Sequence, residues 1–275
     1  MNENENGIFN EDCIEGSKKH IPDESVDLFI GDPPFGIKET SLKNVYARDN
    51  NDIIPGYQEA PADYEKFAYE SVEEVKRILK PNGSGYIITG YNHEHHFRNA
   101  IDSLGMHFIG QIIWIFSFGM NTKKKFVVSH CPILYFKKSK KAKPTFNTHA
   151  RFHPSQRNKN KRSLLYADLQ DVWFIKREYH RGIKRNLTKL PMGLIKKMIQ
   201  YSSNEGDLVC DFFLGNFTTA FVAKGLNRKF TGFEINAEAY NHFMPIYNKT
   251  KYGEKLSEAD IERRRLKNLE DQLFE

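Results

Sequence analysis

Short apolar segments alternate with amphipathic segments along most of this chain, and this alternation limits the fold more than any other feature. Val26–Ile30, Ile109–Phe116 and Leu208–Phe212 read as buried strands. The segments that start at Tyr64 and Pro191 have helical spacing instead. Strands that alternate with helices favour a mostly parallel sheet with helices on both faces. The sequence therefore predicts an α/β domain.

The composition excludes several other classes of protein. Hydrophobic residues make up 39% and charged residues 28% of the 275 residues, as in ordinary globular proteins. The longest apolar segment, Ile109–Met120, is too short to cross a bilayer and contains Gln111 and Ser117. Three widely separated cysteines fit a reducing cytosol, and the polar N-terminus differs from a secretory signal. We expect a cytoplasmic protein without a membrane segment.

Positive charge is concentrated in one segment. Between Lys137 and Arg185 there are 15 basic and three acidic residues, a balance of +12, so the rest of a chain with net charge +6 carries −6. This pattern is typical of a polyanion-binding protein, although a solvated loop has the same composition. The segment lacks a sustained period. We therefore interpret its 137–180 part as an insertion into the α/β body.

The turn Asp32-Pro33-Pro34-Phe35 directly follows the first buried strand. Two prolines remove N–H donors, so the backbone there presents only carbonyl acceptors. An Asp beside such carbonyls can accept two hydrogen bonds from one NH₂ group, and Phe35 adds a face for ring stacking. The turn suits an amino-bearing aromatic ring such as adenine, although a simple Asp-Pro-Pro turn also explains its spacing.

A second turn, Asp211–Thr219, also follows a strand and opens a helix, with Gly215 in the turn and Thr218 available as a cap. Glu234 ends the next strand, where nucleotide-binding α/β folds place the carboxylate that binds ribose. A dinucleotide site would need three glycines. Ligands of open α/β sheets bind outside the carboxyl ends of the strands, so both turns together predict one site for a nucleoside cofactor and an amino base.

These residues resemble the beta-class DNA amino-methyltransferases, which use S-adenosylmethionine. The hallmarks of that family are an Asp-Pro-Pro-Tyr/Phe tetrad followed, in the C-terminal half, by a Phe-x-Gly-x-Gly-Thr-Thr cofactor loop. The chain matches them at Asp32–Phe35 and Phe213–Thr219, in that order. Thr188–Pro191 and Lys229–Glu234 resemble further family segments. The resemblance implies an α/β fold with a mostly parallel, seven-stranded, Rossmann-like methyltransferase sheet.

The resemblance also implies a division of the chain and a set of site residues. The implied parts are a catalytic half over 1–136, a basic target-recognition insertion over 137–180, a cofactor-binding half over 181–250 and a C-terminal helix over 251–275. The implied catalytic residues are Asp32, Pro33, Pro34 and Phe35. The implied cofactor contacts are Asp12, Cys13, Thr188, Asp211, Phe213, Gly215, Asn216, Thr218 and Glu234. The implied DNA contacts are Lys137, Lys138, Lys140, Lys141, Arg151, Arg157, Lys159 and Arg162.

The cofactor loop departs from the family pattern at three positions. Asn216 and Phe217 replace the usual Ser-Gly, and Phe212 replaces a usual Pro. A bulky side chain at position 217 should restrict the approach of the backbone to the methionine end of the cofactor, whereas Asn216 tolerates a left-handed conformation. Because the catalytic tetrad is intact, we predict that the pocket is reshaped and still binds the cofactor.

The resemblance implies methyl transfer from S-adenosylmethionine to N6 of an adenine flipped out of double-stranded DNA. Cytosine-N4 methylation is an alternative, but that branch more often carries Ser in place of Asp32. An RNA substrate, a cofactor-impaired DNA-binding partner and a nicotinamide oxidoreductase are further alternatives. No metal site is predicted, because a polar helix start explains the histidines of Asn92–His96. A homodimer and a companion restriction endonuclease are compatible with the sequence, which specifies neither.

Overall fold

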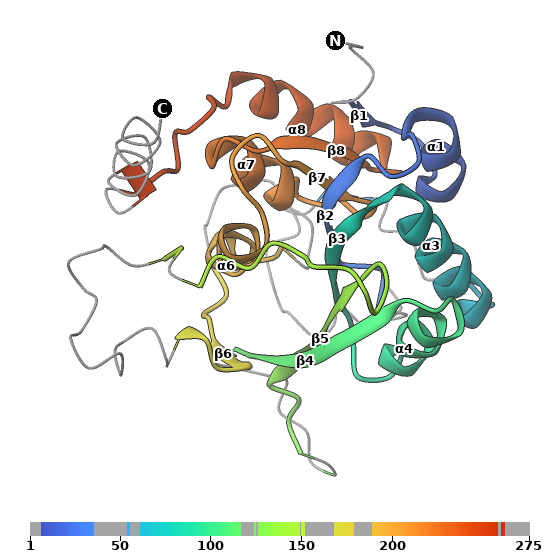
Figure 1. Cartoon of the computed structure of the whole chain (residues 1–275). Helices are drawn as coiled ribbons and strands as arrows, with labels where there is room; N and C mark the ends of the chain where they lie inside the picture. The colour runs from blue at the N-terminus through green and yellow to red at the C-terminus, as the bar shows by residue number, and fades with distance from the viewer. Residues whose placement is uncertain are drawn as a thin grey trace, which may run out of the picture.

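An eight-stranded sheet forms the centre of the part of the chain that the structure describes (Figure 1). In this computed structural model the described residues are 7–35, 54–55, 61–116, 124, 126–148, 150–151, 168–178, 189–257 and 260–261. The strands are β1 (Ile8–Phe9), β2 (Val26–Gly31), β3 (Leu79–Ile88), β4 (His107–Ile115), β5 (His130–Lys137), β6 (Val172–Phe174), β7 (Leu208–Asp211) and β8 (Lys229–Phe233). Their order across the sheet is β1-β8-β7-β2-β3-β5-β4-β6.

Most neighbouring strands of the sheet run parallel. β2 lies between β7 and β3 and pairs in parallel with both. β5 is the exception, because it runs antiparallel to β3 and to β4, with Tyr86 opposite Tyr135 and Trp114 opposite Cys131. β6 adds an edge strand by pairing in parallel with β4. The predicted mostly parallel α/β sheet is confirmed, with eight strands where the family resemblance implied seven.

Helices cover both faces of the sheet, as predicted (Figure 1). One face carries α1 (Cys13–His20), α3 (Tyr64–Ile78) and α4 (Glu94–Ser103). The other face carries α6 (Met192–Ser202), α7 (Thr218–Gly225) and α8 (Ala237–Lys249). Successive side chains of a strand point to opposite faces, so β2 contributes to both cores. Its Phe29 packs with the first group of helices, and its Leu28 and Ile30 pack with the second.

Two N-terminal elements, β1 and α1, are absent from the sequence-based prediction. β1 is only two residues long and pairs Ile8 with Gly232 of β8. α1 contains Gly16 and Ser17, which have weak helix propensity, and its apolar positions are too few to form a stripe. Both elements depend on contacts with residues far away in the sequence, and a local pattern does not reveal such contacts.

The start of β3 differs from what the sequence pattern favours, since the apolar run that reads as a strand begins only at Tyr86. The helix before it ends at Ile78, and β3 begins immediately at Leu79. Leu79 pairs with Val26 and Ser84 pairs with Leu28, so β3 carries extra residues opposite β2. The segment Lys80-Pro81-Asn82-Gly83, whose composition is typical of a helix stop, is therefore a bulged part of the strand, a place where proline and glycine are tolerated.

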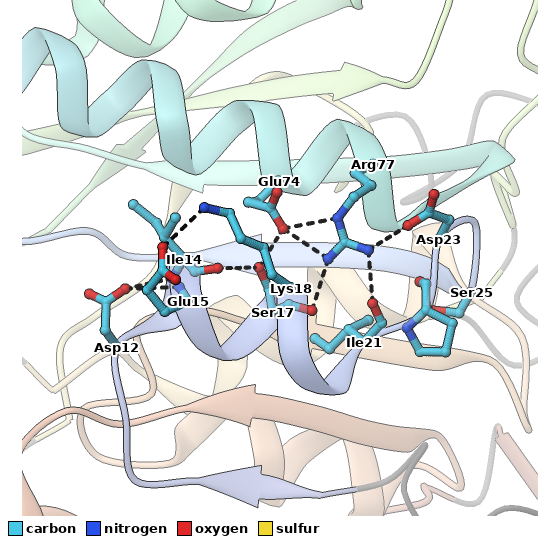
Figure 2. A network of polar contacts seen from close by, with 11 residues as sticks. Asp12, Ile14, Glu15, Ser17, Lys18, Ile21, Asp23, Ser25, Glu74 and Arg77 are labelled. Atoms are coloured by element: carbon cyan, nitrogen blue, oxygen red, sulfur yellow. Dashed lines mark hydrogen bonds and ion pairs between the residues drawn. The ribbon is translucent and has the colours of Figure 1, made fainter.

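A buried polar network fastens α1 to α3 (Figure 2). Ser17 Oγ donates to Glu74 Oε2 at 2.6 Å, and Arg77 Nη2 donates to the same oxygen at 2.8 Å. Arg77 Nη1 also donates to the Ile21 carbonyl at 2.9 Å and to Asp23 Oδ1 at 2.6 Å. Glu74 is almost fully buried, with 8% of its side chain exposed, so Arg77 is its main charge partner. The network fixes the helix that begins beside the candidate site.

Replacing Arg77 by Met is expected to lower the free energy of unfolding by about 3 kcal/mol, because Glu74 would keep a buried carboxylate without a countercharge. Lys18→Ala is the matched control, since Lys18 forms an exposed ion pair with Glu15 beside the same network. Its expected effect is below about 0.5 kcal/mol. Urea denaturation followed by circular dichroism measures both changes. Equal losses in the two variants would contradict a structural role for the Glu74–Arg77 pair.

Two further expectations concern the C-terminus and the membrane. The predicted C-terminal helix over 251–275 lies mostly outside the described residues, so it stays a prediction. Within the described ranges, no helix has the length and apolar character needed to span a bilayer.

Candidate active site

The two turns singled out in the sequence lie side by side at one edge of the sheet. We call this the carboxyl edge, because the parallel strands β2 and β7 end there. β2 and β7 pair directly, with Leu28 opposite Val209 and Phe29 opposite Cys210. A methyl group added at Gly31 would lie 3.3 Å from Cδ2 of Phe213, so the residue before Asp32 lies close to the second turn. The expected meeting of both turns at one edge is confirmed.

Asp32 has an unusual environment at the carboxyl edge. The residue is partly exposed, but its Oδ1 is buried and has no hydrogen-bond partner among the described residues. Burial raises the pKa of Asp32 well above its ordinary value, the charge of Asp211 raises it further, and the charge of Arg177 lowers it. Because buried acceptors in folded proteins normally have partners, this oxygen is available to a ligand that donates a hydrogen bond.

The rest of the tetrad is held by aromatic side chains. Tyr64 Oη donates to the Pro34 carbonyl at 2.8 Å, and the Tyr64 ring stacks on His93 at 3.9 Å between centroids. No described residue donates to the Pro33 carbonyl. Phe35 packs on the backbone of Gly90, where an added methyl group would be 3.5 Å from the ring. The sequence gives no signal for Tyr64 as a supporting residue, because its contact depends on how α3 packs.

Two buried carboxylates organise the second turn. Asp211 Oδ1 accepts a hydrogen bond from the Phe213 amide at 2.8 Å. Burial raises the pKa of Asp211 to about 6, although hydrogen bonds from Thr219 and the backbone lower it. Glu234 Oε2 accepts from the Gly215 amide at 2.6 Å, and Oε1 accepts from the Asn236 amide at 2.8 Å. Burial raises the pKa of Glu234 to about 7.

The loop conformation corrects the expectation for Asn216 and Phe217. Gly215 and Phe217 adopt the left-handed conformation, with φ of 50° and 56°, and Asn216 does not. The Phe217 ring is fully buried and lies 5.6 Å from the Phe243 ring, centroid to centroid. It therefore packs into the core between α7 and α8. The predicted obstruction near the cofactor is not observed, because this side chain is part of the core.

Phe217→Gly is expected to lower the free energy of unfolding by about 2–4 kcal/mol. Removing a buried Phe costs about 3–5 kcal/mol, and relief of the left-handed backbone returns about 1 kcal/mol. Phe221→Ala is the comparison. It removes a partly buried ring beside Phe217, so its loss of stability should be smaller. Thermal and urea unfolding measure the change. Unchanged or higher stability of Phe217→Gly would contradict the anchoring role.

The remaining predicted cofactor residues are placed as follows. Asp12 caps α1, with Oδ1 accepting from the amides of Ile14 at 2.9 Å and Glu15 at 3.1 Å. Cys13 is buried, and burial raises the pKa of its thiol. The charges of Asp12 and Asp211 raise this pKa further. Thr218 donates to the Leu190 carbonyl at 3.4 Å, and Asn216 is buried. Thr188 lies outside the described residues.

The family follows from a comparison of the whole domain. A sequence model described as DNA methylase matches residues 26–245, which include both turns and Glu234. This chain belongs to the DNA methylase family.

Relatives of this DNA methylase are Type II methyltransferases. The chain is 33% identical to M.HpaI of Haemophilus parainfluenzae over 80% of this chain and 67% of that protein. It is 32% identical to M.HinfI of Haemophilus influenzae over 83% of this chain and 64% of that protein. The chain thus spans about two thirds of the length of these relatives.

Solved structures share the fold of this DNA methylase. The complex of M1.HpyAVI with S-adenosylmethionine superposes with a TM-score of 0.60 at 20% identity, covering 88% of this chain and 98% of that one. The cytosine-N4-specific PvuII DNA methyltransferase superposes with a TM-score of 0.64 at 18% identity, covering 89% and 92%.

The predicted DNA contacts at the start of the basic segment lie at the edge of the sheet opposite the two turns. Lys137 ends β5 opposite Ser84, at the edge where β3 enters the sheet, because β5 is antiparallel. Lys137 Nζ donates to the Ala142 carbonyl at 2.8 Å, and Lys138 Nζ donates to the Leu79 carbonyl at 2.6 Å. Their position and internal bonds argue against DNA contacts. Lys140 and Lys141 follow in the same turn and are exposed.

Arg151 also has an internal partner. Its Nε donates to Asp168 Oδ2 at 2.9 Å, and Asp168 Oδ1 receives Lys197 Nζ of α6 at 3.3 Å. These contacts join both ends of the intervening chain, residues 152–167, to one helix. The other predicted DNA contacts fall within that interval, outside the described residues; they are Arg157, Lys159 and Arg162.

Arg177 is a site residue that the sequence prediction missed. It follows β6 at the carboxyl edge, and its charge acts on Asp32. The sequence signal was present, since Arg177 is one of the 15 basic residues counted, but residue type alone did not distinguish it from its neighbours. Among the described residues, no group of three or more His, Cys, Asp or Glu side chains is arranged to hold a metal ion.

Proposed function

We propose that this DNA methylase transfers a methyl group from S-adenosylmethionine to N6 of an adenine flipped out of double-stranded DNA. The observation that carries the proposal is that the Asp32 turn and the Phe213 turn follow two directly paired strands and lie close together at the carboxyl edge. One turn presents acceptors for an amine, and the other presents the carboxylates and amides of a nucleoside site. Their adjacency is what transfer between two bound groups requires.

The second turn fits the proposed cofactor. S-adenosylmethionine, when bound, supplies a methyl group on a positively charged sulfur. Each oxygen of Glu234 already accepts one amide hydrogen and keeps a lone pair for a ribose hydroxyl. Asp12 keeps Oδ2 without a partner among the described residues, so it can accept from the adenine amine of the cofactor. The other residues that we propose to contact the cofactor are Cys13, Asp211, Phe213, Gly215, Asn216, Thr218 and Thr188.

The first turn fits the target amine. Asp32 Oδ1 and the Pro33 carbonyl lack partners among the described residues, and together they can accept both hydrogens of one NH₂ group. These bonds direct the nitrogen lone pair toward the methyl donor, and Phe35 offers a ring for stacking. The raised pKa of Asp32 also makes its carboxylate a better acceptor for the proton that the nitrogen loses. Flipping the base costs a few kcal/mol, which phosphate contacts and stacking offset.

Adenine is proposed over cytosine because the first residue of the tetrad is Asp32 and not Ser. N4 of cytosine is the alternative, since it is also an exocyclic amine beside a ring nitrogen. Incubating the chain with labelled S-adenosylmethionine and unmethylated plasmid, then digesting the DNA to nucleosides, tests the reaction and the base together. N6-methyladenine supports the proposal, N4-methylcytosine supports the alternative, and absence of label in DNA contradicts both.

The DNA is proposed to approach the carboxyl edge, where both turns lie. Phe174 at the end of β6 is 78% exposed there, an unusual state for a large aromatic side chain. Arg157, Lys159 and Arg162 remain proposed phosphate contacts, whereas Lys137 and Lys138 are not retained. A homodimer, a companion restriction endonuclease and a cytoplasmic location stay predictions.

A further inference from the structure

The position of Arg177 is fixed by its neighbours on both sides. Its guanidinium carbon lies 4.3 Å from the centre of the Phe116 ring and 5.3 Å from that of Trp114. The Trp114 indole donates to the Ile175 carbonyl at 2.8 Å, two residues before Arg177. Glu178, the residue after it, accepts from the Met192 amide at 2.9 Å. The guanidinium is thus held over an aromatic surface at the carboxyl edge.

Arg177 and Asp32 are near each other but are not paired. Arg177 Nε and Asp32 Oδ1 are both buried, and neither has a hydrogen-bond partner among the described residues. Cys131 of β5 lies close enough to be affected by both charges. Burial raises the pKa of its thiol, the charge of Arg177 lowers it, and the charge of Asp32 raises it. No ion pair joins the two groups. A ligand that bonds to both is the simplest explanation for a buried donor and acceptor of opposite charge left unsatisfied.

The chemistry of this pair limits that ligand. A carboxylate accepts and a guanidinium donates, so the ligand must present a donor and an acceptor close together. Adenine and cytosine do so, because each carries an exocyclic amine beside a ring nitrogen. Thymine carries no exocyclic amine. Guanine carries a carbonyl oxygen at C6, which Asp32 would repel, and its amine lies at C2, at a different edge of the ring.

We propose that Arg177 is a second base-reading residue, which donates to the ring nitrogen beside the amine while Asp32 accepts from that amine. The inference rests on the proposed function, and it adds a residue and a selection rule to it. Arg177 recognises the amine-and-nitrogen edge, and the aromatic surface of Phe116 and Trp114 keeps its guanidinium oriented.

Arg177→Met is the first test, because Met is long enough to remain on the aromatic surface but donates no hydrogen bond. We expect kcat/KM for DNA to fall by about 10- to 100-fold, while affinity for S-adenosylhomocysteine and the melting temperature stay unchanged. Lys176→Met is the matched control, since it removes the same charge from the adjacent exposed position. Its loss should be about threefold or less and should disappear as salt concentration rises. Equal losses in the two variants would overturn the inference.

The second test replaces the ring nitrogen in the substrate. Methylation mapping first identifies the target base. DNA is then synthesised with an analogue that lacks a ring nitrogen at that position, which is 1-deaza- or 7-deazaadenine, or 3-deazacytosine if cytosine is methylated. Wild-type protein should lose about 10-fold or more with one of these analogues, and Arg177→Met should lose nothing further. The wild-type arm does not depend on the fold of the variant.

The outcomes separate this inference from the proposed function. Wild-type protein that transfers no methyl group to any DNA overturns both. Wild-type protein that is active and tolerates every deaza analogue overturns the role of Arg177 alone. Equal analogue losses in wild type and Arg177→Met overturn it as well.

Discussion

Asp32→Ala is expected to reduce methyl transfer by about 10²- to 10³-fold, the loss typical of removing one group that stabilises a transition state. The substitution removes the buried Oδ1 that we propose as acceptor for the target amine. Binding of S-adenosylhomocysteine should be unchanged, because the second turn retains its own hydrogen bonds. Labelled methyl transfer and isothermal titration calorimetry measure the two effects. Near-normal turnover would contradict the assignment of Asp32.

The same substitution is expected to stabilise the fold. The buried carboxylate oxygen of Asp32 has no partner among the described residues, so its removal should raise the free energy of unfolding by about 1 kcal/mol. The raised pKa fixes the pH dependence. The destabilisation that comes from burying this group is present at neutral pH, where the unfolded chain is ionised, and is absent below the unfolded pKa of about 4, so the two proteins should converge in acid.

Urea unfolding at several pH values tests this gain in stability. Asp102→Ala is the control, because Asp102 is an exposed acid in a surface ion pair with Arg98. It should change neither activity nor the pH dependence of stability. A lower stability of Asp32→Ala at neutral pH would show that the carboxylate has a structural partner in the folded protein.

Glu234→Ala is expected to have the second largest effect. Both carboxylate oxygens accept backbone amides, from Gly215 and Asn236, and these amides would lose their acceptors. Each buried donor left unsatisfied costs about 1–3 kcal/mol, so the loss of two acceptors should lower the free energy of unfolding by about 2–6 kcal/mol. Affinity for S-adenosylmethionine should fall by about tenfold or more, through loss of a charge-assisted bond to ribose. Unchanged cofactor affinity would contradict the ribose assignment.

The raised pKa of Glu234, about 7, predicts opposite pH trends for binding and stability. The folded protein binds a proton at this carboxyl more tightly than the unfolded chain does. Stability contributed by the group is therefore present below its unfolded pKa and is lost as pH rises through about 7. Cofactor affinity should instead increase over the same rise, because only the ionised carboxylate retains all its acceptor sites.

Glu234→Gln isolates these trends from the titration of Asp211, whose pKa is raised to about 6. The variant keeps the size of the side chain and one acceptor oxygen but does not titrate. Its cofactor affinity, measured by calorimetry between about pH 6 and pH 8, should depend less on pH than that of wild type. Identical profiles would assign the pH dependence to Asp211 or to another group.

The parts of the site that the sequence predicts well are those determined locally. The Asp32 turn and Glu234 each directly follow an apolar run, so the strand that positions them can be read from neighbouring residues. The helix α1 could not be predicted in this way. It is held by Glu74 and Arg77, which lie far from it in the sequence.

Three positions show where local reasoning fails. Left-handed backbone is normally associated with Asn or Gly, yet Phe217 adopts it, because burial of its ring outweighs the strain. Charge counting grouped Lys137 with Arg177, but the direction of β5 sends Lys137 to the opposite edge. Arg177 reaches the site because β6 runs parallel to β4 and returns the chain to the carboxyl edge.

The Arg151–Asp168 contact of 2.9 Å has a consequence for how such a protein could change its DNA target. This contact holds together the two residues on either side of positions 152–167, and Lys197 of α6 supports it. Closing a longer loop across fixed ends adds only about 0.6 kcal/mol for each doubling of its length. A stretch of different sequence or length could therefore be placed between Arg151 and Asp168 without moving the Asp32 and Phe213 turns. Under the proposal that Arg157, Lys159 and Arg162 contact DNA, such an exchange would change the DNA target and leave the chemistry in place.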